Sequence, residues 1–238
     1  MNSKYSFITD NLRLSYSSLN TFSTCPYAFK LTYIDDVERE NNYYGVFGTY
    51  LHLILEKFFR NELKESEMVD YFKDNYNKNI TCQPPEYPKN LDIQYYKDAV
   101  KFFENFKFEK ELYEIEFIEN SLKFSYFQKP FVVKPDLVLK RKSDSKRILF
   151  DYKTAKVIKN DKVDVNKING YKNQMFLYAI GLFETKNLVI DEIKIWFIRD
   201  NYIETFKMDL NDQISVIDWI TKTINKIDGE EEFLPNTN

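Results

Sequence analysis

The sequence predicts an α/β fold with a mixed central sheet flanked by helices and an N-terminal helical cap. Two observations predict it: apolar residues recur at helical spacing up to residue 111, and from Leu112 on they alternate as in strands. The 238 residues are about the upper size of one domain, and 43% hydrophobic residues suffice for a buried core. We therefore expect one domain over residues 1–238, with the helical cap in 1–111 and the sheet core in 112–238.

The N-terminal part is predicted to be helical. Ser17–Tyr33 carries apolar residues at helical spacing, and Ser15 or Ser17 is available as its N-cap. Pro26 lies within this segment and predicts a kink or a break into two short helices. Three further helices are expected at Gly45–Leu63, Met68–Asn77 and Leu91–Glu111, the last two separated by the proline-rich loop Thr81–Lys89.

The remaining sequence alternates between strand and helix patterns. Four strands are expected first, Leu112–Ile118 and Leu122–Phe127 as a hairpin around Glu119-Asn120-Ser121, then Phe131–Lys140 and Arg147–Lys153 joined by the charged turn Arg141–Lys146. After them we expect a helix at Asn166–Phe183, a second hairpin of Ile190–Ile198 and Tyr202–Met208, and a final amphipathic helix at Leu210–Ile227.

Three scarcities limit the chemistry. The chain has one histidine, His52, two cysteines, Cys25 and Cys82, and five glycines. One histidine excludes a metal site with several histidines, and two cysteines exclude a self-contained four-cysteine zinc or iron–sulfur site. The scattered glycines form neither a Walker loop nor a dinucleotide-binding turn. Any chemistry must therefore rest on carboxylates, lysines and His52.

The hydropathy pattern predicts no association with a membrane. The longest clean apolar run, Met175–Phe183, has nine residues, well short of a membrane span. The first residues lack the apolar core of a signal peptide. We therefore expect a cytoplasmic protein whose two cysteines are reduced thiols.

The charge is unevenly distributed. The net charge of −3 argues against a general nucleic-acid-binding surface. Residues 134–172, however, hold twelve Lys or Arg against five Asp, a local balance of +7. A solvated loop with alternating charge and a phosphate-facing edge are both compatible with this run, and charge alone does not decide between them.

Two acidic residues interrupt apolar strand patterns. Asp136 follows Pro135 inside the run 132–139, where a carboxylate is costly to bury unless it is paired or bound to a metal. Asp151 and Lys153 flank one residue of the next strand, so both point to the same face. Adjacent strands would bring Asp136 and Asp151 together on one hard divalent cation, and oxygen ligands favour Mg²⁺ or Mn²⁺ over zinc.

The Asp-x-Lys pattern is weak by itself. It also occurs at Asp144-Ser145-Lys146, and glutamate versions occur at Glu184-Thr185-Lys186 and Glu192-Ile193-Lys194. A salt bridge at the end of a strand is the simple alternative for Asp151 and Lys153. Its apolar strand and the preceding Pro-Asp distinguish Asp151-Tyr152-Lys153 from the other three.

Pro135-Asp136 followed by Asp151-Tyr152-Lys153 resembles the signature of the PD-(D/E)xK nucleases, the restriction-endonuclease-like superfamily. Further matches resemble its RecB-type branch, which includes the nuclease domains of RecB and AddB and the CRISPR-adaptation exonucleases. They are Ser15-Tyr16-Ser17-Ser18-Leu19 with Phe22, Cys25-Pro26 and Phe29, then Gly48-Thr49-Tyr50-Leu51-His52 with Leu55-Glu56, and Gln174-Met175-Phe176-Leu177-Tyr178. The matches keep the family's order over residues 15–178.

The resemblance implies a restriction-endonuclease-like fold and a role for each matched residue. Lys153 would orient or help to deprotonate the attacking water and stabilise the charge of the transition state, beside the catalytic carboxylates Asp136 and Asp151. Gln174 and Tyr178 would contact DNA at the rim of the site. The implied ligands of Mg²⁺ or Mn²⁺ are His52, Asp136, Asp151 and the main-chain carbonyl of Tyr152.

Glu116, Glu56 and Cys25 lie near further positions at which members of the family carry functional residues. Relatives often carry a glutamate where Glu116 stands on the first strand, although Glu114 shares its face, and Glu56 is expected to be a helix-surface charge. Many members bind a 4Fe–4S cluster through one N-terminal and three C-terminal cysteines, and Cys25 stands at the first position. The printed sequence ends before the others, so either the cluster is lost or the sequence stops short of it. No complete iron–sulfur cluster is expected in this chain.

The resemblance implies a metal-dependent nuclease that hydrolyses phosphodiester bonds of DNA. We expect an exonuclease in recombination, repair or phage DNA processing, with DNA as substrate and a helicase or recombination protein as partner. Two alternatives stay open: a catalytically silent nuclease-like DNA-binding or assembly module for a helicase, and a structure-selective endonuclease. The intact set of His52, Asp136, Asp151 and Lys153 argues against the silent module.

Overall fold

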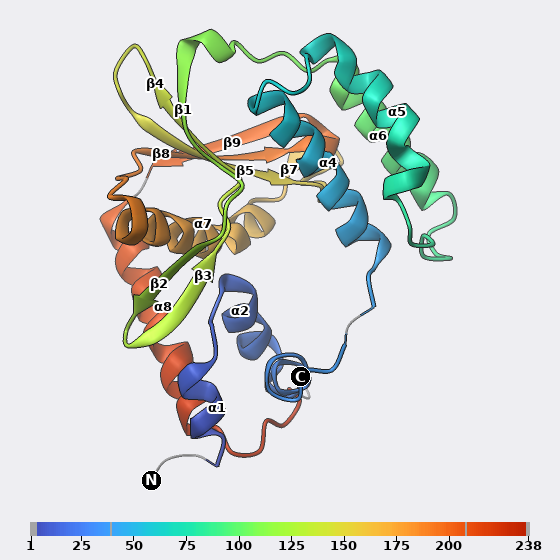
Figure 1. Ribbon diagram of the computed structural model, residues 1–238. Helices are drawn as coiled ribbons and strands as arrows, with labels where there is room; N and C mark the ends of the chain where they lie inside the picture. The colour runs from blue at the N-terminus through green and yellow to red at the C-terminus, as the bar shows by residue number, and fades with distance from the viewer. Residues whose placement is uncertain (1–3, 39, 208, 237–238) are drawn as a thin grey trace.

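The computed structural model describes residues 4–38, 40–207 and 209–236. Its centre is a five-stranded mixed sheet in the order β1-β4-β5-β8-β9, in which β5 and β8 are parallel and the other neighbours antiparallel (Figure 1). The strands are β1 (Tyr113–Ile118), β4 (Leu137–Arg141), β5 (Arg147–Lys153), β8 (Glu192–Phe197) and β9 (Tyr202–Lys207). The predicted α/β fold with a mixed sheet is confirmed.

Helices precede, interrupt and follow this sheet. They are α1 (Ser6–Asn11), α2 (Tyr16–Thr24), α3 (Pro26–Phe29) with a π-helical turn at Lys30–Ile34, α4 (Tyr43–Phe59), α5 (Met68–Asn79), α6 (Leu91–Glu104), α7 (Val165–Lys186) and α8 (Leu210–Gly229). Two small antiparallel sheets complete the fold, β2 (Leu122–Tyr126) with β3 (Lys129–Val133), and β6 (Ile158–Lys159) with β7 (Lys162–Val163). None of the described helices is both long and apolar enough to cross a lipid bilayer.

Two hydrophobic clusters lie on opposite faces of the central sheet. Along β5, Ile148, Phe150 and Tyr152 join one cluster, whereas Leu149 joins the other, because successive side chains of a strand point to opposite faces. Residues of α4, α5 and α6 complete the first cluster, and residues of α2, α7 and α8 complete the second (Figure 1). The predicted helical cap is thus divided between the two faces of the sheet.

The predicted first hairpin is wrong. β1 pairs with β4, and Ile118 lies opposite Leu137, while β2 leaves the central sheet and pairs with β3. The β2–β3 sheet packs on α7 at Gly181, where an added Cβ would lie 2.4 Å from Val133 Cγ2. Packing against α7 at Gly181 therefore outweighs the local turn after β1, and β2 pairs with β3 instead of with β1.

The predicted strand Phe131–Lys140 is two strands. β3 ends at Val133 and β4 begins at Leu137, with Pro135 between them. Proline has no N–H to donate to the hydrogen bonds between strands, so a strand in the interior of the fold cannot continue through it. Asp136 consequently lies directly before β4 instead of inside a strand.

The remaining differences are smaller. Pro26 begins α3 and Ser15 caps α2, as predicted. The helix predicted for Leu91–Glu111 ends at Glu104, α1 and the β6–β7 sheet were not predicted, and the predicted strand end Met208 lies outside the described residues. The helix predicted at Asn166–Phe183 and the second hairpin are confirmed within a few residues at their ends.

Candidate active site

The antiparallel pairing of β4 and β5 places the two predicted acidic positions at one end of the sheet. Asp136 directly precedes Leu137, which pairs with Phe150 of β5, and Asp151 is the next residue of that strand. The main-chain N–H of Tyr152 donates to Asp136 Oδ2 at 2.7 Å. Both acids are buried, with 6% and 2% of their surfaces exposed, so this end of the sheet holds two carboxylates away from bulk water.

His52 reaches the same place from α4. Its Nδ1 lies 3.4 Å from both Asp136 Oδ1 and Glu119 Oε1, and its Nε2 lies 3.0 Å from the main-chain oxygen of Tyr152. Burial disfavours the imidazolium, but the two carboxylates outweigh burial and raise the pKa of His52 to about 10. Without a metal, a protonated imidazole therefore lies between the two acids, and binding of a metal by His52 would displace a proton from its ring.

Glu119 is the acidic residue that the sequence reasoning missed. It follows β1 directly, and its main-chain N–H donates to the main-chain oxygen of Asp136. Its Oε2 lies 2.6 Å from Lys134 Nζ. Burial raises the pKa of Glu119, but the nearby His52 and the hydrogen bond from Lys134 outweigh burial and lower this pKa overall, so the carboxylate stays ionised. A glutamate where a strand of the pattern ends was the available signal.

The glutamate expected from the family comparison, Glu116, lies elsewhere. Its carboxylate pairs with Arg147 at 2.7 Å on the sheet, outside the cluster around His52. Glu56 pairs with Arg60 one helical turn later on α4, at 2.8 Å, and lines the cavity beside His52, so its interpretation as a helix-surface charge stays a prediction.

Asp151 and Lys153 point to the same side of β5, as their spacing predicts. Lys153 Nζ lies 2.6 Å from Asp151 Oδ2, and both side chains are largely buried. Burial and the nearby Asp136 raise the pKa of Asp151, although Lys153 opposes them. Burial lowers the pKa of Lys153, but Asp151 outweighs it and the net shift is upward. Lys153 is therefore a fixed cation at neutral pH.

Residues of α7 hold this lysine from the other side. Gln174 Oε1 accepts a hydrogen bond from Lys153 Nζ at 2.7 Å, and Gln174 Nε2 donates to the Tyr178 hydroxyl at 2.8 Å. The Lys153 ammonium also lies 4.9 Å from the centre of the Tyr171 ring, a cation–π contact that the sequence reasoning did not single out. The α7 side chains thus orient Lys153, and a contact of Gln174 or Tyr178 with DNA stays a prediction.

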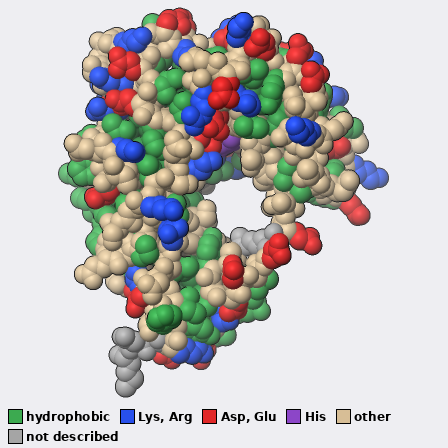
Figure 2. Space-filling model, in the orientation of Figure 1, with side chains coloured by type: hydrophobic (Ala, Val, Ile, Leu, Met, Phe, Trp, Pro, Cys, Tyr) green, Lys and Arg blue, Asp and Glu red, His purple; other side chains and the backbone are tan. Residues whose placement is uncertain are grey.

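A cavity of about 480 Å³ opens onto this cluster. It is lined by residues of α4, of the strand ends and of α7, among them His52, Glu119, Lys134, Tyr152, Lys153, Thr154, Ala155 and Tyr171. Figure 2 shows acidic and basic side chains together above a hollow in the face that is in view. The cluster is therefore buried at its base and open on one side, as a substrate site requires.

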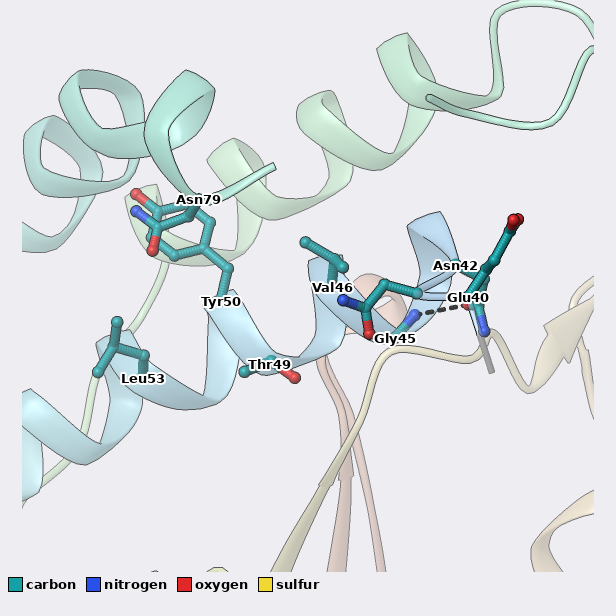
Figure 3. A pocket seen from close by; sticks show the side chains of 9 residues that line it. Glu40, Asn42, Gly45, Val46, Thr49, Tyr50, Leu53 and Asn79 are labelled. Atoms are coloured by element: carbon teal, nitrogen blue, oxygen red, sulfur yellow. Dashed lines mark hydrogen bonds between the residues drawn. The ribbon is translucent and has the colours of Figure 1, made fainter. Parts of the chain in front are cut away.

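A second cavity, about 510 Å³, lies along α4 and shares Gly45, Thr49 and Leu53 with the first. Figure 3 shows its lining, in which Val46, Thr49, Tyr50 and Leu53 project from α4, Asn42 lies at the start of the helix and Asn79 lies near Tyr50. The larger cavity contains none of the clustered acids or lysines. The chemistry-bearing residues, and not the cavity size, identify the candidate site.

The donor atoms fit a divalent cation. His52, Glu119 and Asp136 each offer one atom, and these atoms lie within 4.8 Å of one another. The buried Glu119 Oε1 and Asp151 Oδ2 accept no well-aligned hydrogen bond. Carboxylate oxygens and one imidazole suit Mg²⁺ or Mn²⁺. Of the predicted ligands, the structure brings His52, Asp136 and the Tyr152 carbonyl together, while Asp151 faces Lys153.

The model of the PD-(D/E)XK nuclease superfamily matches residues 13–238. The chain belongs to this superfamily. A search of curated proteins finds no match for this PD-(D/E)XK member. Among solved structures it is similar to a protein from Eubacterium rectale, provisionally named an exonuclease, with a TM-score of 0.55 and 13% identity over 94% of this chain and 85% of the other. At that identity the likeness shows the shared restriction-endonuclease-like fold.

Proposed function

We propose that this PD-(D/E)XK superfamily member is a divalent-metal-dependent DNA nuclease. The observation that carries the proposal is the convergence of His52, Glu119 and Asp136 next to the Asp151–Lys153 pair. Mg²⁺ or Mn²⁺ held by His52, Asp136 and Glu119, with the Tyr152 carbonyl and Asp151 alongside, would lower the pKa of a bound water and neutralise charge on phosphate oxygens.

The protein's own groups perform the positioning. The Tyr152 N–H fixes Asp136, and Asp151 with Gln174 fixes the Lys153 ammonium at the edge of the cavity. Because Lys153 keeps its proton, it acts as a positive charge and hydrogen-bond donor toward a phosphate and its attacking water. Of the two roles that the resemblance implies for Lys153, we therefore propose orientation of the water and stabilisation of charge.

We infer an exonuclease of the RecB-type branch acting in the cytoplasm on DNA ends in recombination, repair or phage DNA processing, with a helicase or recombination protein as partner. Support comes from the ordered motifs, among them Gln174 and Tyr178 on the helix after the Asp-x-Lys strand. The fold shared with a protein provisionally named an exonuclease points in the same direction.

The test uses DNA with and without ends. Purified protein is incubated in Mn²⁺ with linear single- and double-stranded DNA labelled at the 5′ or 3′ end, and with circular DNA of the same sequence. An exonuclease is supported if wild type shortens linear DNA progressively from one end and leaves circular DNA intact. The Asp151→Asn variant should then shorten neither substrate. Cleavage of circles would replace it with an endonuclease. No cleavage of any substrate would favour the silent DNA-binding module.

A further inference from the structure

The lysines and arginines of residues 134–172 fall into two groups, those that pair with a carboxylate and those that do not. Most of its cations lie within 4 Å of a carboxylate, including Lys134, Arg141, Arg147 and Lys156. Among the described residues, no carboxylate lies within ion-pair distance of Lys142, Lys159, Lys162 or Lys167. Two of these four, Lys159 and Lys162, form the exposed tip of the β6–β7 sheet.

The β6–β7 ribbon, residues Ile158–Val163, is a two-stranded hairpin with a two-residue turn. Asn160 and Asp161 occupy the turn with φ of 49° and 59°, which are the backbone angles of a type I′ turn. Lys159 and Lys162 are direct partners across the ribbon, and both are exposed. Like charges in directly opposed positions destabilise a strand pair, so the folded state gains nothing from this arrangement by itself.

The base of the ribbon is firmly held. Asp200 Oδ2 accepts hydrogen bonds from the main-chain N–H groups of Val157 and Ile158, at 2.6 and 3.0 Å. Val157 is buried in the core, and Lys156 pairs with Asp98 of α6 at 3.0 Å. The lysines at the tip are therefore presented at a fixed place instead of on a loose loop.

That place is beside the candidate active site. The chain runs from Lys153 through Thr154 and Ala155, which line the cavity, directly into the ribbon. After the ribbon the chain enters α7 (Figure 1). Gln174 of this helix accepts a hydrogen bond from Lys153. The ribbon therefore continues directly from the segment that lines the cavity, and a strand of DNA that extends from the cavity along the ribbon would meet the two exposed lysines.

We propose that the β6–β7 ribbon is a phosphate-binding finger that holds the DNA backbone next to the scissile bond. The inference rests on the proposed nuclease function and names the part of the chain that grips the substrate. Opposed side chains stand about 5 Å apart across a ribbon, so the two ammonium groups reach neighbouring phosphates of one strand. The repulsion between Lys159 and Lys162 is relieved by the negative charge, and the contact carries no base preference.

The test measures binding at several salt concentrations. A labelled single-stranded oligonucleotide is titrated in EDTA, which prevents metal-dependent cleavage, with wild type and with the double variant Lys159→Gln/Lys162→Gln. Loss of two phosphate contacts should make the negative slope of the logarithm of the binding constant against log salt shallower by about 1.4. It should also weaken binding about tenfold at low salt. In Mn²⁺ the same variant raises KM and leaves kcat near the wild-type value.

Two single variants sharpen this test. Lys142→Gln removes an exposed lysine without a carboxylate partner from the β4–β5 turn, at the opposite end of β5, and should leave the salt slope unchanged. Asp161→Asn removes the acidic residue at the ribbon tip, and asparagine tolerates its positive φ equally well. It should tighten binding, the opposite of the double variant.

The outcomes separate the two proposals. An unchanged salt slope and KM in the double variant, with cleavage still lost in Asp151→Asn, would overturn the finger and leave the nuclease standing. If the wild type cleaves no DNA, but the double variant loses the salt-dependent binding that the wild type shows, the finger would stand and the nuclease would be overturned. A drop in the slope equal to that of Lys142→Gln would show general surface charge and would also overturn the finger.

Discussion

Two Asp-x-Lys tripeptides stand at opposite ends of β5, and the structure treats them differently. In Asp144-Ser145-Lys146, in the turn before the strand, the carboxylate lies 3.6 Å from the lysine and also pairs with Arg141 at 3.0 Å. In Asp151-Tyr152-Lys153 the distance is 2.6 Å and the carboxylate is 3% exposed. The same sequence pattern thus gives a solvated ion pair at one end and a buried one at the other.

The surroundings extend the contrast. Near the turn, acids and bases are matched, as in the partly exposed pairs of Arg141 with Glu192 and Arg147 with Glu116, whereas fully exposed ion pairs are each worth about 0–1 kcal/mol. Near Asp151 the side chains of Glu119, Asp136 and Asp151 are almost completely buried, their partners are His52, Lys134 and Lys153, and His52 carries a strongly raised pKa. Partly exposed ion pairs are typical of a stabilising surface, whereas a buried charged cluster with a perturbed pKa beside a cavity is typical of a functional site.

The largest expected effect distinguishes the two aspartates. Asp151→Asn should reduce Mn²⁺-dependent DNA cleavage by about 10³-fold or more, because it removes a buried charge next to the reacting phosphate. Asp144→Asn, in the exposed turn, should stay within about twofold of wild type. Initial rates on a labelled linear substrate measure both. Equal losses in the two variants would remove the distinction between the ends of β5.

The two lysines give the next effect. Lys153→Met should lower kcat by about 10²–10⁴-fold, the range for loss of a positioned proton donor or cation, while Lys146→Met should leave kcat unchanged. Because Lys153 is a fixed cation, the pH profile of the residual activity should keep its shape. Thermal melting by circular dichroism controls for folding. A Lys153→Met enzyme whose pH profile loses one limb would show that Lys153 acts as the general base instead.

Two glutamates of the β1 region provide a third pair. Glu119→Gln should weaken Mn²⁺ binding about 10–100-fold, because its carboxylate belongs to the group around His52. Glu116→Gln should leave Mn²⁺ affinity unchanged and cost at most about 1 kcal/mol of stability, since it breaks one partly exposed pair with Arg147. Calorimetric titration and urea unfolding measure the two quantities. Weaker Mn²⁺ binding in Glu116→Gln instead would restore the assignment taken from the family comparison.

The smallest effect is a pH dependence of stability in the metal-free protein. The pKa of His52 is raised to about 10 in the folded state from 6.5 in the unfolded state. The stabilisation is therefore fully present below about pH 6.5 and is lost as the pH rises through about 10. Urea unfolding in EDTA between pH 7 and 10 should show a fall in wild type that His52→Asn lacks. Asp144→Asn should follow wild type, and parallel curves for wild type and His52→Asn would contradict the charged imidazole.

Features encoded within short segments were predictable from the sequence. Apolar spacing located α4, α7 and β5, and the strand period placed Asp151 and Lys153 on one face. The ordered motifs brought His52 into the same group before any contact was known, and its closeness to Asp136 agrees with that expectation. These inferences need only the local backbone and the order of the motifs.

Features set by distant contacts were not predictable in the same way. The turn at Glu119 suggested a hairpin, but β1 pairs with β4 and β2 packs on α7, because burial against other elements decides strand partners. Glu119 enters the site through that pairing, so its position at the end of a strand pattern was only a weak signal in the sequence. The β6–β7 turn at Asn160-Asp161 is different, since two adjacent residues that tolerate positive φ are a hairpin signal that was available.

The central claim is that the Asp151 end of β5 holds a divalent cation and the Asp144 end does not. Titration calorimetry of Mn²⁺ into wild type, Asp136→Asn and Asp144→Asn tests it most directly. We expect one Mn²⁺ site in wild type and in Asp144→Asn, and its loss in Asp136→Asn, where the carboxylate that faces His52 becomes an amide. The same Mn²⁺ binding in all three proteins would contradict it.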